Sequence, residues 1–206
     1  PPRQRKMKKM SKIWITSDAH FSHIQPFVWE ARGYKSVEEM NEAQVRKWNE
    51  VVSDEDEVWV LGDLMLGDFE QSLSYLKQLK GKIHVCLGNH DTSRREQAYR
   101  DLGWDVQLCA RIKYKKISFY LSHYPTISHN IDEKELWQVV VNLYGHLHQT
   151  TNFFHDDPWM YHVGVDSHDG YPVSMDQVLA DICAEMKKCE AMLDNDVTEG
   201  GAASAT

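Results

Sequence analysis

Aspartate, asparagine and histidine side chains recur in five short clusters, and these residue types bind divalent metal ions. Together with the glycines beside them, the clusters hold seven candidate ligands: Asp18, His20, Asp63 after Gly62, Asn89 after Gly88, His123, and His146 and His148 after Gly145. Mixed oxygen and nitrogen ligands suit Mn²⁺, Fe or Zn²⁺ better than Ca²⁺. The chain has no Cys-x-x-Cys pair, which argues against a structural zinc cage.

The spacing within the clusters indicates how one ion could be held. Asp18 and His20 stand two residues apart, so that both can reach one ion from a turn that leaves a strand. The carboxylate of Asp63 has two oxygens and can bridge two cations. A single Asp-x-His or Gly-Asp is most often an ordinary turn. The ordered set of five clusters is much more specific, and Gly145-His146-Leu147-His148 is its strongest member.

Each cluster follows a short apolar run, and this order predicts where the clusters meet. The runs predict strands over residues 12–16, 57–61, 82–87, 117–121 and 139–144, and a further strand is expected over 160–165. Open α/β sheets place their sites at the carboxyl ends of strands. We therefore expect an α/β fold in which several strand ends converge on one cleft.

Helical patterns separate the predicted strands. Ser36 and Glu39 form a capping box before a helix over 37–52, and apolar residues recur at helical spacing over 69–79. Ser174 and Gln177 cap a last helix whose stripe comprises Val178, Ile182, Met186, Cys189 and Leu193. We expect that stripe to pack on the core, with a homodimer seam as the alternative. One domain is expected over residues 11–195, with tails at 1–10 and 196–206.

Composition disfavours several function classes. The 206 residues are 42% hydrophobic, enough for one sizeable core, and 23 basic against 31 acidic residues give a net charge of −8. That balance disfavours a duplex DNA binder, which needs clustered Lys and Arg. Four cysteines without a dense framework indicate free thiols in a reducing compartment. No apolar run approaches the ~20 residues that span a bilayer, so a cytoplasmic protein is expected.

The ordered clusters resemble the calcineurin-like metallophosphoesterase superfamily over about residues 12–166. The resemblance is to its small single-domain branch of bacteria and phages, and it extends to residues 21–23, 32–34, 38–41, 48–49 and 163–166. It implies a four-layer α-β-β-α sandwich of two mixed β-sheets flanked by helices, and a dinuclear metal centre. Mn²⁺ is the expected ion, with Fe, Zn²⁺, Ni²⁺ or Mg²⁺ as alternatives.

The resemblance also implies roles for individual residues. Asp18, His20, Asp63 and His148 would hold the first ion, and Asp63, Asn89, His123 and His146 the second, so that Asp63 bridges the two. His90 resembles the non-ligand histidine that contacts substrate and assists the leaving group. The implied activity is hydrolysis of a small phosphodiester or phosphomonoester, a nucleotide among the candidates, by attack of a metal-bound hydroxide.

One difference from the protein phosphatases of the family narrows the range of expected substrates. Protein Ser/Thr phosphatases of the superfamily carry Gly-Asp-x-x-Asp-Arg-Gly, whereas residues 62–68 here read Gly-Asp-Leu-Met-Leu-Gly-Asp. A phosphoprotein substrate is therefore less favoured, and the group that orients His90 is not identified. His23 and Arg32 are candidate substrate-binding residues, Arg32 as a bidentate phosphate clamp, with an ordinary surface salt bridge as the alternative. A nuclease for single-stranded nucleic acid and a metal-binding scaffold without turnover are the alternative functions.

Overall fold

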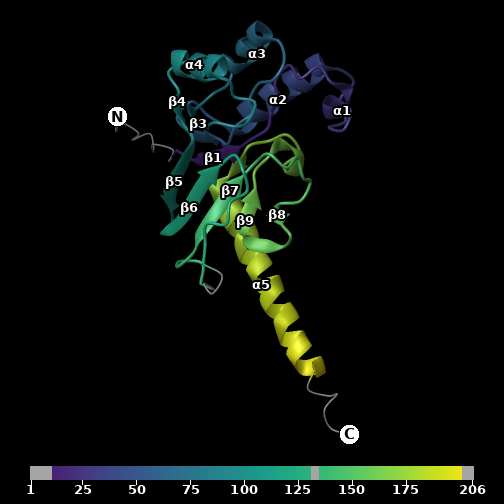
Figure 1. Cartoon of the computed structure of the whole chain (residues 1–206), viewed down its shortest axis with the longest axis vertical. Helices are drawn as coiled ribbons and strands as arrows, with labels where there is room; N and C mark the ends of the chain where they lie inside the picture. The colour runs from purple at the N-terminus through teal and green to yellow at the C-terminus, as the bar shows by residue number, and fades with distance from the viewer. Residues whose placement is uncertain (1–10, 131–134, 201–206) are drawn as a thin grey trace, which may run out of the picture.

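Two mixed five-stranded sheets with flanking helices form the structure, as the sequence predicts (Figure 1). The computed structural model describes residues 11–130 and 135–200. The elements in chain order are β1 (Ile13–Thr16), α1 (Pro26–Trp29), α2 (Val37–Val51), β2 (Glu57–Val60), α3 (Phe69–Leu76), β3 (Lys82–Cys86), α4 (Ser93–Asp101), β4 (Asp105–Gln107), β5 (Cys109–Tyr114), β6 (Ile117–Ser122), β7 (Val140–Tyr144), β8 (Phe153–Phe154), β9 (Asp157–His162), η1 (Val165–Ser167), β10 (Val173–Ser174) and α5 (Met175–Gly200).

The first sheet has the strand order β10-β1-β2-β3-β4, and its strands from β1 to β4 run parallel. Strands in such a sheet are covered on both faces and are therefore almost continuously apolar. In β2, Val58 and Val60 pack with the helices, whereas Trp59 points to the opposite face and joins the core between the sheets. The parallel order brings the carboxyl ends of β1, β2 and β3 to one edge.

The second sheet has the order β5-β6-β7-β9-β8, and its β6 and β7 also run parallel. Phe119 and Leu143 from this sheet share one apolar cluster with Ile15 and Leu61 from the first. Val178 of α5 packs into the same cluster, which accounts for one part of the predicted stripe. The sheets are therefore joined by a continuous core, and polar residues that follow β6 and β7 can meet those that follow the first sheet.

The three predicted helices are present as α2, α3 and α5, but the capping box before α2 is only half formed. Ser36 accepts a hydrogen bond from the Glu39 amide at 3.1 Å, although the Glu39 carboxylate accepts from the Lys35 amide and not from Ser36. Ser174 accepts from the amide of Gln177 at 3.2 Å, at the start of α5. Helix α5 extends away from the sheets in Figure 1. The side chains of Cys189 and Leu193 lie outside the described part.

The strand predicted over residues 160–165 is wrong in its bounds. Strand β9 covers Asp157–His162, because the backbone turns at Gly164 into the short helix η1. The sequence patterns also leave out α1, α4, β4, β5, β8 and β10. Most of these elements are short, or they are polar like α4, so they carry little periodicity of their own. Strand β5 is the exception, because Ala110, Ile112 and Tyr114 alternate with polar residues and could have been recognised. Among the described residues, no helix has the length and hydropathy to cross a bilayer.

Asp56 fixes the start of the first two strands. Its buried carboxylate accepts hydrogen bonds from the Lys12 amide at 2.8 Å, the Trp14 indole at 3.1 Å, and the Ser53 amide and hydroxyl at 3.0 and 2.8 Å. Burial alone would raise the pKa of Asp56, but the hydrogen bonds lower that pKa from 3.8 to about 2. The ionised carboxylate therefore stabilises the fold.

We expect Asp56→Asn to lower the free energy of unfolding by about 2 kcal/mol at pH 7. Because the folded pKa is depressed, the contribution is present above pH 4 and disappears as the pH falls from about 4 to 2. Urea unfolding of both proteins between pH 7 and pH 3 measures this convergence. Asp54→Asn, at an exposed position of the same turn, should change little. A difference that stays constant with pH would contradict the assignment.

Candidate metal centre

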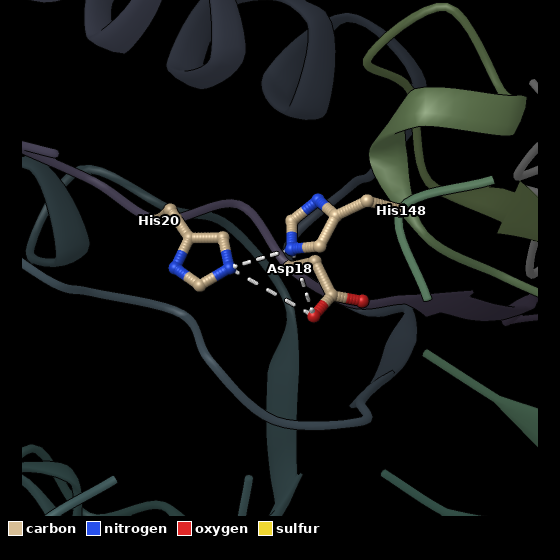
Figure 2. Close-up of side chains that lie close together, drawn as sticks. All are labelled: Asp18, His20 and His148. Carbon is tan, nitrogen blue, oxygen red and sulfur yellow. Dashed lines mark hydrogen bonds and ion pairs between the residues drawn. The ribbon is translucent and has the colours of Figure 1, made fainter. Parts of the chain in front are cut away.

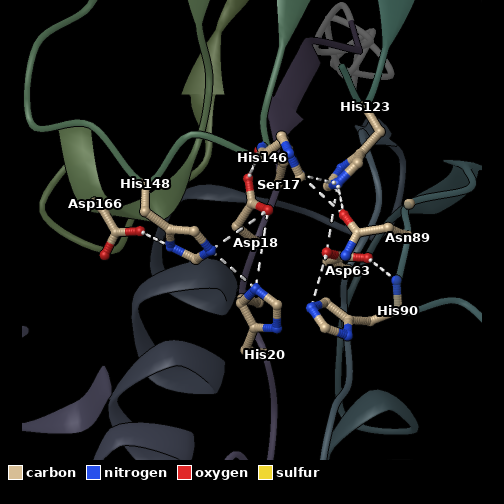
Figure 3. A network of polar contacts seen from close by, with 12 residues as sticks. Ser17, Asp18, His20, Asp63, Asn89, His90, His123, His146, His148 and Asp166 are labelled. Atoms are coloured by element: carbon tan, nitrogen blue, oxygen red, sulfur yellow. Dashed lines mark hydrogen bonds and ion pairs between the residues drawn. The ribbon is translucent and has the colours of Figure 1, made fainter. Parts of the chain in front are cut away.

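The loops after five strands bring the seven candidate ligands to one place between the sheets (Figure 3). Backbone hydrogen bonds tie these loops together: the Asp18 amide donates to the Gly62 carbonyl at 3.1 Å, and the Gly145 amide donates to the His123 carbonyl at 3.0 Å. Two loops come from the second sheet and three from the first. The convergence expected from the strand ends is therefore present.

Left-handed backbone recurs among these ligands. The angle φ lies between 49° and 68° at five of them, Asp18, His20, Asp63, His146 and His148. Such a conformation costs roughly 1–2 kcal/mol for a residue with a Cβ atom, and it persists only where the surroundings fix it. Strain of this kind concentrates at functional sites.

Two glycines allow the loops to approach. A Cβ atom at Gly88 would lie 2.2 Å from Asp63 Oδ1, and one at Gly145 would lie 2.4 Å from Asp18 Oδ2. Any side chain at either position would displace a candidate ligand. The glycines in the Gly-Asn and Gly-His motifs are therefore required by close packing against the carboxylates.

Asp18, His20 and His148 form a first group of ligand atoms (Figure 2). The Nε2 atoms of the two histidines are 3.1 Å apart, and each lies 3.9 Å from Asp18 Oδ1. That oxygen is buried and has no hydrogen-bond partner, whereas Oδ2 accepts from the Ser17 hydroxyl and the His146 amide. An unpaired buried carboxylate oxygen is costly unless a cation faces it. The group therefore fits a divalent metal ion.

Asp63, Asn89, His123 and His146 form a second group. His123 Nε2 lies 2.8 Å from Asn89 Oδ1, 3.2 Å from His146 Nδ1 and 3.4 Å from Asp63 Oδ2. His146 Nδ1 lies 2.9 Å from Asn89 Oδ1. Ligands that surround one ion with bonds of ~2.1 Å lie about 3.0–3.4 Å apart. The separations of 3.2 and 3.4 Å fall in that range, and the two separations from Asn89 Oδ1, 2.8 and 2.9 Å, are slightly shorter. The His123 Nδ1 atom lies 2.8 Å from the Leu61 carbonyl, which orients the ring.

The two groups adjoin through two buried carboxylates. Ligand atoms of Asp18, Asp63 and His123 lie within 4.8 Å of one another, so Asp18 belongs to the first group and borders the second. Asp63 also accepts a hydrogen bond from the His90 amide at 2.8 Å. The role of Asp63 as the bridging ligand stays a prediction.

Burial sets the protonation of the ligands. Burial, with further effects from His148 and Arg32, lowers the pKa of His20 to about 2, and burial beside His123 lowers the pKa of His146. Both rings are therefore neutral at pH 7, the form in which imidazole binds metals. Burial raises the pKa of Asp63, and a cation would stabilise its ionised form.

The structure places the three other candidates around the same centre. His90 is partly exposed, its ring lies 5.5 Å from that of His20, and its Nε2 is 4.0 Å from Asp63 Oδ2. The ring of His23 packs edge-on against Phe27. Arg32 pairs with Asp166 at 2.8 Å, so it does form a salt bridge, but the side chain is nine-tenths buried and the pair does not lie at the surface.

Sequence reasoning did not select Asp166 or Asp91 as site residues. Asp166 Oδ2 lies 2.8 Å from His148 Nδ1, and Asp91 Oδ2 accepts from the amides of Asp63 and Gly88. Burial alone would raise the pKa of Asp166, but hydrogen bonds from His148 and Arg32 hold it well below its usual range. Asp166 follows an apolar run, as the predicted ligands do, and that signal could have identified it.

A cavity of about 500 Å³ opens beside the first group. Its lining combines four histidines and the Arg32–Asp166 ion pair with four apolar residues, which form its apolar wall: His20, His23, His90, His148, Arg32, Asp166, and Phe27, Val28, Ala31 and Leu66. Its size is that of a small-molecule site. The cavity thus connects candidate metal ligands with an apolar wall.

Comparisons with known proteins agree with this geometry. The sequence profile of the calcineurin-like phosphoesterase superfamily domain matches residues 11–175. The chain is 30% identical over 178 residues to the uncharacterized protein MJ1445 of Methanocaldococcus jannaschii, covering 82% of this chain and 90% of that one. It is 31% identical over 196 residues to the Gene 66 protein of Mycobacterium phage D29, covering 82% and 94%.

A solved structure supports the fold. The crystal structure of AQ665, a protein of unknown function from Aquifex aeolicus, aligns with a TM-score of 0.61 at 20% identity and covers 82% of this chain and 98% of that one. Since the domain profile spans most of the chain and agrees with the strand-end clusters, this protein belongs to the calcineurin-like phosphoesterase superfamily.

Proposed function

We propose that the protein hydrolyses a small phosphodiester or phosphomonoester with the help of two divalent metal ions. The observation that carries the proposal is the pair of adjoining ligand groups, in which the buried Asp18 Oδ1 has no hydrogen-bond partner. Asp18, His20 and His148 would hold one ion, Asn89, His123 and His146 the other, and Asp63 both. Ligands that mix oxygen with imidazole nitrogen suit Mn²⁺, Fe or Zn²⁺, and Mn²⁺ is the ion proposed here.

When bound, two such cations activate water and neutralise charge on the phosphoryl oxygens. The chain's own residues supply the scaffold for that chemistry. The strained loops hold the ligand atoms in place before substrate arrives. Asp18, Asp63 and His123 are buried, whereas Asn89 and His148 are exposed, so the cluster is open to solvent on one side only. Preorganised polar groups of this kind stabilise developing charge without reorganisation.

His90 is the proposed general acid. Its backbone is fixed by the bond from its amide to Asp63 and by the bond from Arg95 to its carbonyl, while its ring remains partly exposed and lines the cavity. A ring at this position can donate a proton to the departing oxygen of the ester.

The apolar wall of the cavity supports an ester with a hydrophobic arm. Phe27 is exposed, with 71% of its surface accessible, and packs edge-on against His23, so its ring is available to a planar group. Val28, Ala31 and Leu66 extend this wall. A cavity of this size suits a small molecule.

The metal assignment predicts different losses for two substitutions. Asp63→Asn should lose both ions, because one carboxylate serves both, whereas His123→Ala should lose mainly one. Elemental analysis of purified proteins, together with turnover of p-nitrophenyl phosphate and bis-p-nitrophenyl phosphate, measures both effects. Two ions at full occupancy in Asp63→Asn would show that Asp63 does not bridge the ions. If Asp18→Asn loses both ions and Asp63→Asn does not, Asp18 is the bridging ligand. Metals without turnover of any ester would favour a scaffold.

His90→Ala should keep both ions and the fold but lose about 10²–10⁴-fold in rate on esters with poor leaving groups. The loss should be smaller for p-nitrophenolate, which departs without a proton. The rate lost by the variant is measured for a series of phosphodiesters and compared with the pKa of each leaving group. An equal loss across the series would show that His90 positions the phosphate instead.

Phe27→Ala should weaken the binding of phenyl phosphate about 5- to 10-fold, since an aromatic contact contributes ~1 kcal/mol. Binding of methyl phosphate should not change, because it has no group to reach the apolar wall. Competition against a chromogenic diester gives both inhibition constants. Leu108→Ala, at an exposed apolar position outside the cavity, is the control. If phenyl phosphate and methyl phosphate both bind more weakly by the same factor, the arm of the ester does not contact Phe27.

A further inference from the structure

The Arg32 guanidinium uses all five of its N–H groups on acceptors within the protein. Nε and Nη2 donate to the two carboxylate oxygens of Asp166 at 2.8 and 3.2 Å. Nη2 also donates to the Asp18 carbonyl at 2.8 Å, and Nη1 donates to the Ala19 carbonyl at 2.9 Å and faces Met40 Sδ at 3.6 Å. Four of the five donors are bonded to oxygen and the fifth faces a thioether, which is a weak acceptor, so no pair of donors is left for a bidentate bond to phosphate.

The acceptors on one side of Arg32 belong to the loop after β1. Asp18 and His20 both have left-handed backbone there, with φ of 59° and 52°. Arg32 holds the carbonyl of Asp18 and that of Ala19, the residue between the two candidate ligands. These bonds therefore oppose relaxation of a strained turn that carries two of the three ligands of the first group.

Asp166, the acceptor on the other side of Arg32, orients His148, the third ligand of the first group. Asp166 accepts from Arg32 and lies 2.8 Å from His148 Nδ1, as Figure 3 shows for the Asp166–His148 contact. A carboxylate on one ring nitrogen fixes the tautomer, so that the other nitrogen presents its lone pair to a metal. His148 Nε2 is the atom that faces His20 Nε2 at 3.1 Å.

We propose that Arg32 and Asp166 act as one positioning unit that holds Asp18, His20 and His148 in register for the first metal ion, and that Arg32 is not a phosphate clamp. The proposal rests on the proposed function only in taking the first group as a metal site. One guanidinium spans two loops from different sheets, which a single-headed lysine ammonium cannot do. The planar Arg32 guanidinium can donate to both carboxylate oxygens of Asp166 and to the two carbonyls at the same time.

The test is metal binding by Arg32→Lys, Asp166→Asn and the double variant, with Mn²⁺ alone as the probe. Calorimetric titration of chelator-treated protein should show one of two sites weakened about 10- to 100-fold and the other unchanged. The double variant should be little worse than the more damaging single variant, because the two residues act together. Arg94→Lys, an exposed arginine that pairs with Glu70, is the matched control.

Steady-state kinetics separate positioning from clamping. A positioning role predicts that excess Mn²⁺ restores kcat of Arg32→Lys toward the wild-type value, with KM for a diester nearly unchanged. Unchanged affinity at both Mn²⁺ sites would overturn the proposal, and a tenfold rise in KM and in the inhibition constant of inorganic phosphate would then assign the clamp. Circular dichroism checks folding. If Arg32→Lys does not fold, Asp166→Asn, which keeps the shape of the side chain, decides by the same Mn²⁺ titration.

A wild-type protein that hydrolyses no ester would contradict the proposed function and leave this result standing. Conversely, an active wild-type protein whose Mn²⁺ affinities do not respond to Arg32→Lys or Asp166→Asn would remove only the positioning role.

Discussion

Two buried carboxylates close to one another impose the constraint on which the site depends. Asp18 and Asp63 have almost no solvent contact, and ligand atoms of both lie within 4.8 Å of His123. Two ionised carboxylates that are buried near one another destabilise the folded protein unless positive charge or hydrogen-bond donors compensate them. Amides of His90 and His146 supply part of that compensation. The neighbouring imidazoles supply ligand atoms and not charge where burial keeps them neutral, as it does for His20.

The acidic composition of the chain is compatible with this chemistry. A net charge of −8 would repel a phosphate ester from an ordinary surface, and Arg32, nine-tenths buried beside the site, is neutralised by Asp166. Metal ions therefore have to carry the local positive charge in the proposed reaction. The same reasoning explains why basic clusters are not needed here, in contrast to proteins that bind nucleic acid through their own side chains.

The position of the site could be predicted from sequence, but the contacts that hold it could not. Short apolar runs that end in Gly, Asp, Asn or His predicted which loops converge, because strand direction and sheet order place successive strand ends together. Side-chain direction has no such signature. Arg32 follows a four-residue helix that shows no periodicity, and its partner Asp166 lies 134 residues away. The strand predicted over residues 160–165 differs from β9 for a related reason. The turn at Gly164 depends on packing against Ser17 and His162, which the local sequence does not show.

The division of the ligands between the two sheets has a consequence for the order in which the protein matures. Asp18, His20, Asp63 and Asn89 all precede β4, whereas His123, His146 and His148 follow β6 and β7. Neither group is complete in the first hundred residues, so a growing chain that has formed only β1 to β4 of the first sheet holds Asp18 and Asp63 without His123, His146 and His148. Metal binding couples to folding where the ligand set is assembled. Metal loading would therefore report the docking of the two sheets, and would come after synthesis of β7.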